Sequence, residues 1–140
     1  MNKSKSAEDY MKNILILYKR NGAVRSVDIA DEMGVTRPSV CNAMKKLRDE
    51  NLIYFSDKGL IFFTDAGKAI AEKAYRKHTL LTKALVGIGV NESTAVKEAC
   101  SIEHVISDET YECLNEFFKT HIGVRASKET KHREKEERGV

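Results

Sequence analysis

The sequence has few of the residues that characterise membrane proteins or disulfide-bonded secreted proteins. Its 140 residues include three cysteines, one proline, no tryptophan and no long apolar run. Because no such run exists, we expect no membrane span. The segment Met1–Asp9 is polar and lacks the apolar region that a secretion signal requires. The odd number of cysteines, with no CxxC pair, argues against a disulfide framework and favours a reducing, cytoplasmic environment.

Positive charge is only slightly in excess. Lysine and arginine number 24 against 21 aspartates and glutamates, a formal net charge of +3. This excess is too small to indicate nucleic-acid binding, so the placement of the basic residues must support any such function. The densest run of charge covers residues 126–140, which are predicted to form a disordered tail.

The spacing of apolar residues in the first half predicts three helices. The first covers about residues 7–20, and a short second helix over Ser26–Met33 is stopped by Gly34. Thr36 is expected to cap the third helix. Pro38 is tolerated in its first turn, because an N–H group is not needed there.

The period of the pattern then changes from helical to extended. Two β-prone runs, Leu52–Phe55 and Leu60–Phe63, are separated by Ser56–Gly59, a turn sequence typical of hairpins. Three helices followed by a hairpin are the order of a winged helix-turn-helix. We therefore expect a mostly α-helical chain whose first domain, residues 1–66, is a winged helix-turn-helix with a small β-hairpin wing.

Residues 67–125 are expected to form an all-helical dimerisation domain. A long helix begins near Thr64, and two shorter helices begin near Asn91 and Ser107. One face of the last helix is apolar enough to be a dimer interface, or else it closes the core of the monomer. That face consists of Tyr111, Leu114, Phe117, Phe118 and His121.

The third predicted helix has the features of a DNA-recognition helix. Val40, Met44 and Leu47 face inward at helical spacing, which leaves short polar side chains in the first turns and lysines behind them. Polar groups of this kind can reach base edges, and basic groups can neutralise phosphates. The alternative is that the basic residues form only a solvated face. The order of helices and hairpin favours DNA binding over that alternative. Asn42 can pair with adenine through two hydrogen bonds. The predicted DNA contacts are Thr36, Arg37, Pro38, Ser39, Asn42, Lys45, Lys46 and, at the hairpin tip, Lys58.

Three metal-ligating residue types fall within one turn of the helix predicted after Asn91. If Val96 and Ala99 face inward, Cys100, Glu103 and His104 lie on or beside the same face, at i, i+3 and i+4. A carboxylate on an inward face is costly unless it is paired or bound to metal. Sulfur, oxygen and nitrogen donors together favour a transition metal over calcium or magnesium.

His78 is a possible additional ligand on the long helix. It lies in an apolar stripe between Ala74 and Leu81, where it is either a hydrogen-bonded core residue or a metal ligand. The other two cysteines are not expected to be ligands. Cys113 is predicted to lie in the core, and Cys41 on the surface of the recognition helix.

These segments resemble the diphtheria-toxin-repressor family, which includes manganese-transport regulators. The resemblance covers the chain to about residue 120 and is carried by Glu8–Tyr10, Thr36–Val40, Arg76–His78, and Cys100–His104 followed by Ser107–Glu109. It implies a cytoplasmic homodimer in which a divalent metal activates binding to double-stranded operator DNA. Such regulators usually repress genes for metal uptake.

The resemblance also implies a set of ligands. Cys100, Glu103 and His104 fall on positions of the main regulatory site, Asp9 falls on the ligand of the first helix, and His78 falls on a histidine of a neighbouring site. From the residues alone, Asp9 could equally be a helix-start carboxylate or part of a capping box with Ser6. A metal that joined Asp9 to the Cys-Glu-His turn would restrict the movement of the winged helix.

The sequence departs from the family pattern at three positions. Lys12 stands where manganese regulators have a carboxylate, and its charge would oppose a second cation. Thr82 and Val96 stand where iron-type members place further ligands, and the chain is too short for their extra SH3-like domain. It therefore resembles the short manganese-type form with an iron-type cysteine. The thiolate of Cys100 favours Fe²⁺, Co²⁺ or Zn²⁺ over Mn²⁺. Because raw affinity would favour zinc over iron, availability in the cell must choose the metal, and we expect Fe²⁺ first and Mn²⁺ next.

Two other functions are compatible with parts of the pattern. A metal-independent winged-helix regulator could sense a small molecule or an oxidant, with Cys100 as a redox switch. A small metalloenzyme could use the same donors with one open coordination position. The enzyme is disfavoured, because no glycine-rich pocket loop and no separate acid–base pair accompany the donors.

Overall fold

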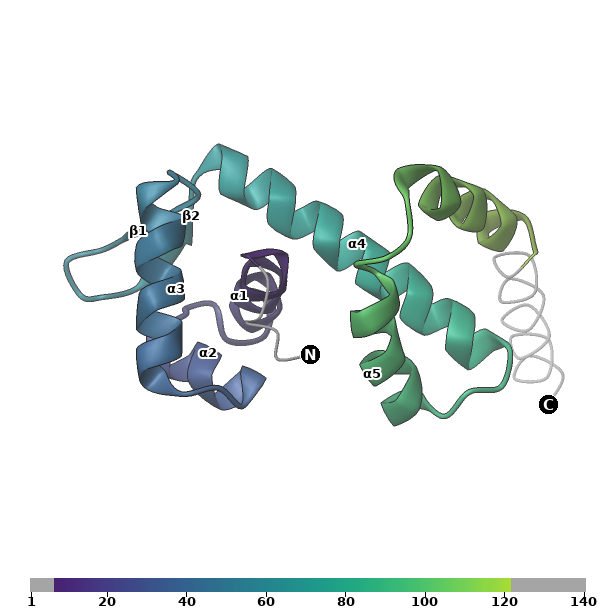
Figure 1. Cartoon of the computed structure of the whole chain (residues 1–140), viewed down its shortest axis with the longest axis horizontal. Helices are drawn as coiled ribbons and strands as arrows, with labels where there is room; N and C mark the ends of the chain where they lie inside the picture. Colours follow the sequence, from purple (N-terminus) through teal and green to yellow (C-terminus); the bar gives the residue numbers. More distant parts are fainter. Residues whose placement is uncertain (1–6, 122–140) are drawn as a thin grey trace, which may run out of the picture. The chain divides into compact units, whose positions relative to one another are not determined.

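The computed structural model describes residues 7–121, and its contacts divide the chain into two compact units (Figure 1). Among the described residues, the first unit ends at Arg76 and the second begins at Lys77. Helix α4 (Asp65–Gly87) contributes residues to both. The expected tail over residues 126–140 lies outside the described residues. Within 7–121, no helix is both long enough and apolar enough to cross a membrane.

The first unit begins with three helices, as the sequence predicts. They are α1 (Ala7–Asn21), α2 (Ser26–Met33) and α3 (Arg37–Asp49). Gly34 ends α2 in the left-handed conformation, with φ of 65°, a region that glycine enters without the steric cost of a Cβ atom. This turn sets the angle between α2 and α3, so the position of the recognition helix depends on it.

A two-stranded hairpin follows α3 and forms the wing. Strand β1 (Ile53–Phe55) pairs antiparallel with β2 (Ile61–Phe63), and the backbone N–H of Ile61 also donates to the carbonyl of Val24 at 2.8 Å. That bond ties the hairpin to the segment between α1 and α2. Helices and hairpin enclose one core, whose largest fully buried apolar residues are Met11, Ile14, Ile29, Met44, Leu47, Ile53, Ile61, Val24 and Val40. The predicted winged helix-turn-helix is confirmed.

The junction between the hairpin and α4 is held by a threonine and a glycine. The Thr64 hydroxyl donates to the Asn51 carbonyl at 2.7 Å and accepts from the Gly67 N–H at 3.1 Å, which caps α4. A Cβ atom on Gly67 would overlap the backbone carbonyl oxygen of Leu52, so only glycine allows this close approach. The start of α4 is thereby fastened to the end of α3.

The second unit is helical over its described residues. It contains the later part of α4, helix α5 (Glu92–Ile102) and a last helix over 108–121. The Asn91 side chain caps α5 by accepting from the Ser93 N–H at 3.0 Å. Lys77 forms an ion pair with Asp108 at 3.2 Å, which links α4 to the start of the last helix.

Two predictions about inward faces in this unit are wrong. The buried residues of α5 are Ala95 and Ala99, spaced one turn apart, whereas Val96 is 40% exposed because it lies one position further around the helix. Cys113 is exposed, not in the core, because Tyr111 and Leu114 define the more buried side of the last helix. Cys41 is exposed, as predicted.

Candidate metal centre and nucleic-acid interface

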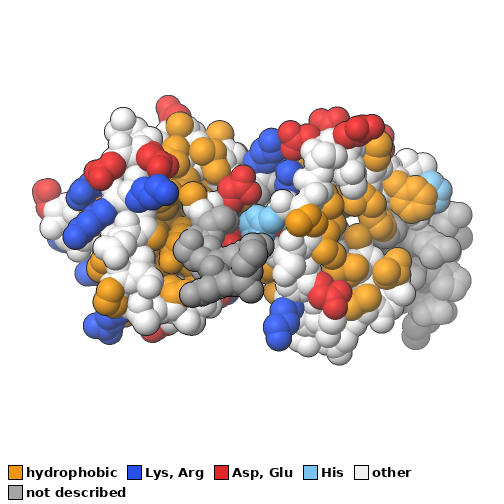
Figure 2. Space-filling view, in the orientation of Figure 1, with side chains coloured by type: hydrophobic (Ala, Val, Ile, Leu, Met, Phe, Trp, Pro, Cys, Tyr) orange, Lys and Arg blue, Asp and Glu red, His pale blue; other side chains and the backbone are white. Residues whose placement is uncertain are grey.

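Helix α3 presents a polar and basic face to solvent. Val40, Met44 and Leu47 are buried, as predicted. Lysine and arginine side chains are exposed over the surface formed by α3 and the hairpin (Figure 2). All eight predicted DNA contacts are exposed: Thr36, Arg37, Pro38, Ser39, Asn42, Lys45, Lys46 and Lys58.

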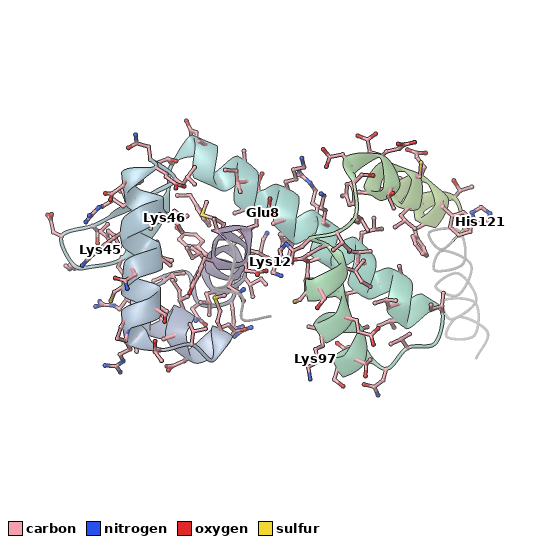
Figure 3. All side chains as sticks on the ribbon, viewed as in Figure 1. Glu8, Lys12, Lys45, Lys46, Lys97 and His121 are labelled. Carbon is pink, nitrogen blue, oxygen red and sulfur yellow. The ribbon has the colours of Figure 1, made fainter. Side chains whose placement is uncertain are left out.

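The start of α3 is ordered by its own side chains. Thr36 Oγ1 accepts from the Ser39 N–H at 3.3 Å, and its hydroxyl donates to Ser39 Oγ at 2.8 Å. Pro38 occupies the first turn, where its missing N–H is not required. Lys45 and Lys46 lie further along the helix (Figure 3). Polar groups therefore lie at the N-terminal end and basic groups behind them, as DNA recognition by a helix requires.

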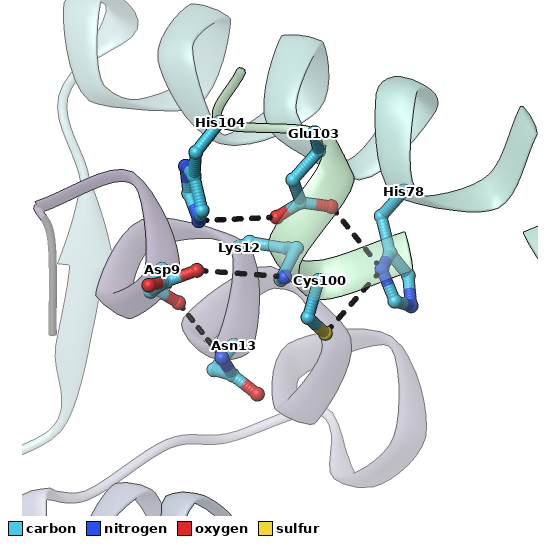
Figure 4. A network of polar contacts seen from close by, with 7 residues as sticks. All are labelled: Asp9, Lys12, Asn13, His78, Cys100, Glu103 and His104. Carbon is cyan, nitrogen blue, oxygen red and sulfur yellow. Dashed lines mark hydrogen bonds and ion pairs between the residues drawn. The ribbon is translucent and has the colours of Figure 1, made fainter. Parts of the chain in front are cut away.

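Four potential metal ligands form a connected network within the second unit (Figure 4). His78 Nδ1 lies 3.2 Å from Glu103 Oε2 and 3.6 Å from Cys100 Sγ. On the other side of the carboxylate, Glu103 Oε1 lies 3.7 Å from Nε2 of His104. The sequence predicted the turn of three donors. It left open whether His78 from α4 joins them, and the structure places its ring against both Cys100 and Glu103.

Glu103 is the buried centre of this network. Helix α5 ends at Ile102, and the Glu103 N–H still donates to the Ala99 carbonyl at 3.0 Å, so Glu103 continues the buried row of Ala95 and Ala99. Only 5% of Glu103 is exposed. Burying a carboxylate is costly unless it is paired or bound to a cation. A buried carboxylate beside a thiol and two imidazoles fits a divalent transition metal, because each donor type binds such ions.

Asp9 lies in the first turn of α1, in the first unit. Its carboxylate Oδ1 is 3.6 Å from Lys12 Nζ, and its backbone carbonyl accepts from Asn13 Nδ2 at 2.8 Å (Figure 4). Lys12 is only 2% exposed. Burial, and secondarily the Asp9 carboxylate, raise the pKa of Tyr10 above its ordinary value, which keeps that hydroxyl protonated. The alternative role of Asp9, a capping box with Ser6, involves a residue that lies outside the described residues.

Sequence reasoning did not foresee the ion pair of Lys12 with Asp9. Their i, i+3 spacing on a helix was the available signal. Neither of the other two departures from the family pattern offers a charged donor. Val96 has no donor atom, and Thr82 Oγ1 is buried without a hydrogen-bond partner in the part of the chain that the structure describes.

Comparison with known families matches both halves of the chain. Residues 3–60 match the N-terminal DNA-binding domain of the iron-dependent repressors. Residues 64–122 match the metal-binding and dimerisation domain of the same repressors. The first match contains α3 and the first strand of the hairpin, and the second contains the network around Glu103.

Individual relatives agree with these matches. The transcriptional regulator MntR of Geobacillus thermodenitrificans is 39% identical over 103 residues, which are 73% of this chain and 72% of that protein. MntR of Escherichia coli O157:H7 is 30% identical over 114 residues, 81% of this chain and 74% of that protein. The solved structure of the manganese regulator SloR superposes with a TM-score of 0.71 at 30% identity, over 81% of this chain. This chain spans about half, 54%, of the SloR chain. From the two domain matches and these relatives, the chain belongs to the iron-dependent repressor family of metal-dependent transcriptional regulators.

Proposed function

We propose that this protein is a cytoplasmic repressor whose binding to operator DNA is activated by a divalent iron or manganese ion, and that it controls genes for metal uptake. The observation that carries the proposal is the buried Glu103 carboxylate in contact with His78 and His104. This network lies in the segment that matches a metal-binding domain, while the exposed face of α3 lies in a segment that matches a DNA-binding domain.

The proposed ligands are Cys100, Glu103 and His104, together with His78 and Asp9. A bound cation would neutralise Glu103 and would supply a fixed positive centre for the surrounding donors. Coordination by Asp9 as well would connect α1 of the winged helix to the second unit and limit its movement. Dimers of winged helices bind half-sites about one DNA turn apart, roughly 34 Å, so limited movement would favour one spacing of the two recognition helices.

We propose iron(II) as the physiological metal and manganese(II) as the next candidate. A thiol donor such as Cys100 favours iron over manganese, because softer ligands prefer the later metals of the series. The relative SloR is described as a manganese regulator, which supports the second choice. Cys100 is partly exposed and in contact with His78, so it is accessible to an incoming ion.

The test is a metal titration that follows DNA binding. A duplex is first selected from a randomised pool with the protein and Mn²⁺, and its retardation is then measured with anaerobic Fe²⁺, with Mn²⁺ and with Mg²⁺. We expect Fe²⁺ and Mn²⁺ to increase the affinity for the duplex, Mg²⁺ to have little effect, and a chelator to reverse the increase. The same DNA affinity with and without metal would instead favour the regulator that senses a small molecule or an oxidant.

We further propose that the second unit forms the homodimer. Large apolar side chains are exposed on it (Figure 2), a surface that water disfavours and a partner subunit would cover. On the last helix, Phe117 is 53% exposed and stacks on His121 at 4.1 Å between ring centroids. The exposed apolar residues of the unit are Val86, Ile88, Val96, Val105 and Phe117.

Replacing Phe117 with serine should weaken the dimer. Buried aromatic anchors at an interface contribute about 2 kcal/mol or more, so the dissociation constant should rise by at least about 30-fold. Analytical ultracentrifugation over a range of concentrations measures this change. Lys119→Ser, at an exposed position on the same helix, is the matched control. Equal dimerisation of both variants would remove Phe117 from the interface.

A further inference from the structure

We propose that Lys77 is a positioning residue of the metal centre, which fastens the turn that carries Glu103 and His104 to α4 without coordinating metal itself. This inference rests on the proposed function, because it takes Glu103 and His104 as ligands. Every residue that it involves belongs to the second unit. Lys77 would set the affinity for the metal, while the set of ligands stays the same.

The two proposed ligands lie in a short turn between α5 and the last helix. Within this turn, the N–H groups of Val105 and Ile106 both donate to the Ile102 carbonyl, at 3.0 and 3.2 Å. Both bonds run back to the end of α5. They order the turn relative to α5, but they do not fix it relative to α4.

Two consecutive residues of α4 contact this turn, one near each of its ends. Near the beginning, His78 Nδ1 lies 3.2 Å from Glu103 Oε2 (Figure 4). Just after the end, Lys77 Nζ lies 3.2 Å from Oδ1 of Asp108, which begins the last helix. Because consecutive side chains leave a helix in different directions, the two contacts hold the turn from different sides of α4.

The Lys77 side chain is itself held in place by two groups of the last helix. Its side chain is only 15% exposed, although that of Asp108 is 64% exposed. Its ammonium also lies 6.0 Å from the centroid of the Tyr111 ring, within the range of a cation–π attraction. Lysine usually stays in water unless its charge is paired, and the other described lysines of this unit are exposed. They are Lys83, Lys97 and Lys119.

The position of the turn affects metal affinity through conformational freedom. A transition metal requires its donors at about 2.0–2.3 Å. A turn already fastened to α4 loses little freedom when an ion binds, whereas a loose turn must be ordered at the expense of affinity. The charge of Lys77 acts in the opposite direction, because removing a positive charge favours the binding of a cation. The sign of the change therefore distinguishes positioning from a simple charge effect.

The experiment measures the affinity of the full-length protein for Co²⁺ by anaerobic absorption titration. We expect Lys77→Met to bind Co²⁺ about 3- to 10-fold more weakly, the size of effect expected from an ion pair and a cation–π contact of this exposure. At saturation the thiolate charge-transfer and ligand-field bands should match those of the wild type, because the ligands are unchanged. Lys77→Arg keeps the charge and can contact both the carboxylate and the ring, so it should restore the affinity.

A second readout uses the metal-free protein. Amide hydrogen exchange at Val105 and Ile106, followed by nuclear magnetic resonance, should be faster in Lys77→Met and close to wild type in Lys77→Arg. Lys83→Met, at an exposed position of α4, is the matched control and should change neither the exchange nor the affinity. Asp108→Asn removes the partner carboxylate and should also weaken Co²⁺ binding, so it tests the proposal if Lys77→Met does not fold.

Unchanged or tighter Co²⁺ binding in Lys77→Met would overturn the positioning role and leave the proposed function intact. Weaker binding that Lys77→Arg does not restore would overturn it as well, because the loss would then not come from the charged contact. A wild-type protein that binds none of Co²⁺, Fe²⁺ and Mn²⁺ would overturn the proposed function itself.

Discussion

The Glu103→Ala variant is expected to lose metal-stimulated DNA binding and to remain folded. Glu103 is the only carboxylate in the described network of the second unit, and it links two imidazoles, so its removal deletes one ligand and releases both histidines. Loss of a supporting partner alone costs about 10- to 100-fold in metal affinity, and loss of a direct ligand should cost at least about 100-fold. Without bound metal, the activating effect on DNA binding should disappear.

Two measurements check this result. Isothermal titration with Mn²⁺ gives the metal affinity, and fluorescence anisotropy of the selected duplex, with and without Mn²⁺, gives the stimulation. Glu98→Ala is the matched control, because Glu98 lies on α5, the helix that Glu103 directly follows, and is exposed. Equal stimulation in Glu103→Ala and Glu98→Ala would refute the assignment of Glu103 as a ligand. Circular dichroism establishes whether Glu103→Ala is folded. If it is unfolded, Glu103→Gln replaces it, because glutamine keeps the side-chain volume of glutamate.

Asn42→Ala should weaken binding to the selected duplex far more than binding to random DNA. Asn42 is exposed on the first turns of α3, and its amide can form two hydrogen bonds to adenine. Losing such a pair costs about 1–3 kcal/mol of discrimination, while phosphate contacts are unaffected. The metal-loaded protein should therefore lose specificity while keeping most of its non-specific affinity.

Lys46→Ala provides the contrast for this prediction. A lysine that contacts phosphate contributes about equally to every sequence, so its loss should weaken both duplexes and reduce the salt dependence of binding. Anisotropy titrations of both variants on both duplexes, over a range of salt concentrations, separate the two effects. If Asn42→Ala weakens both duplexes equally, Asn42 does not read a base.

Much of the fold could be predicted because its signals are local. Gly34 ends α2, Thr36 caps α3 and Asn91 caps α5, and each acts through its own turn of backbone. The hairpin was predicted for the same reason, since two short β-prone runs flank a turn sequence. Such signals need no knowledge of distant residues, and the helix and strand positions follow from them.

The predictions that are wrong concern which side of a helix faces inward. On α5, Val96 and Ala95 are neighbours in sequence, and only packing against another element decides which of them is buried. Cys113 presents the same difficulty on the last helix. A small apolar residue or a cysteine is compatible with either side of a helix, so periodicity alone does not decide whether it is buried.

The amino-acid order by itself determined the helices, the hairpin, the polar face of α3 and the spacing of Cys100, Glu103 and His104, because each of these depends on residues within a few positions of one another. Only the tertiary structure decided that His78, 22 residues before Cys100, lies against it, and that Lys12 is buried in its ion pair with Asp9. The physical reason is that burial and contacts between helices depend on how whole elements pack, which a local pattern does not encode.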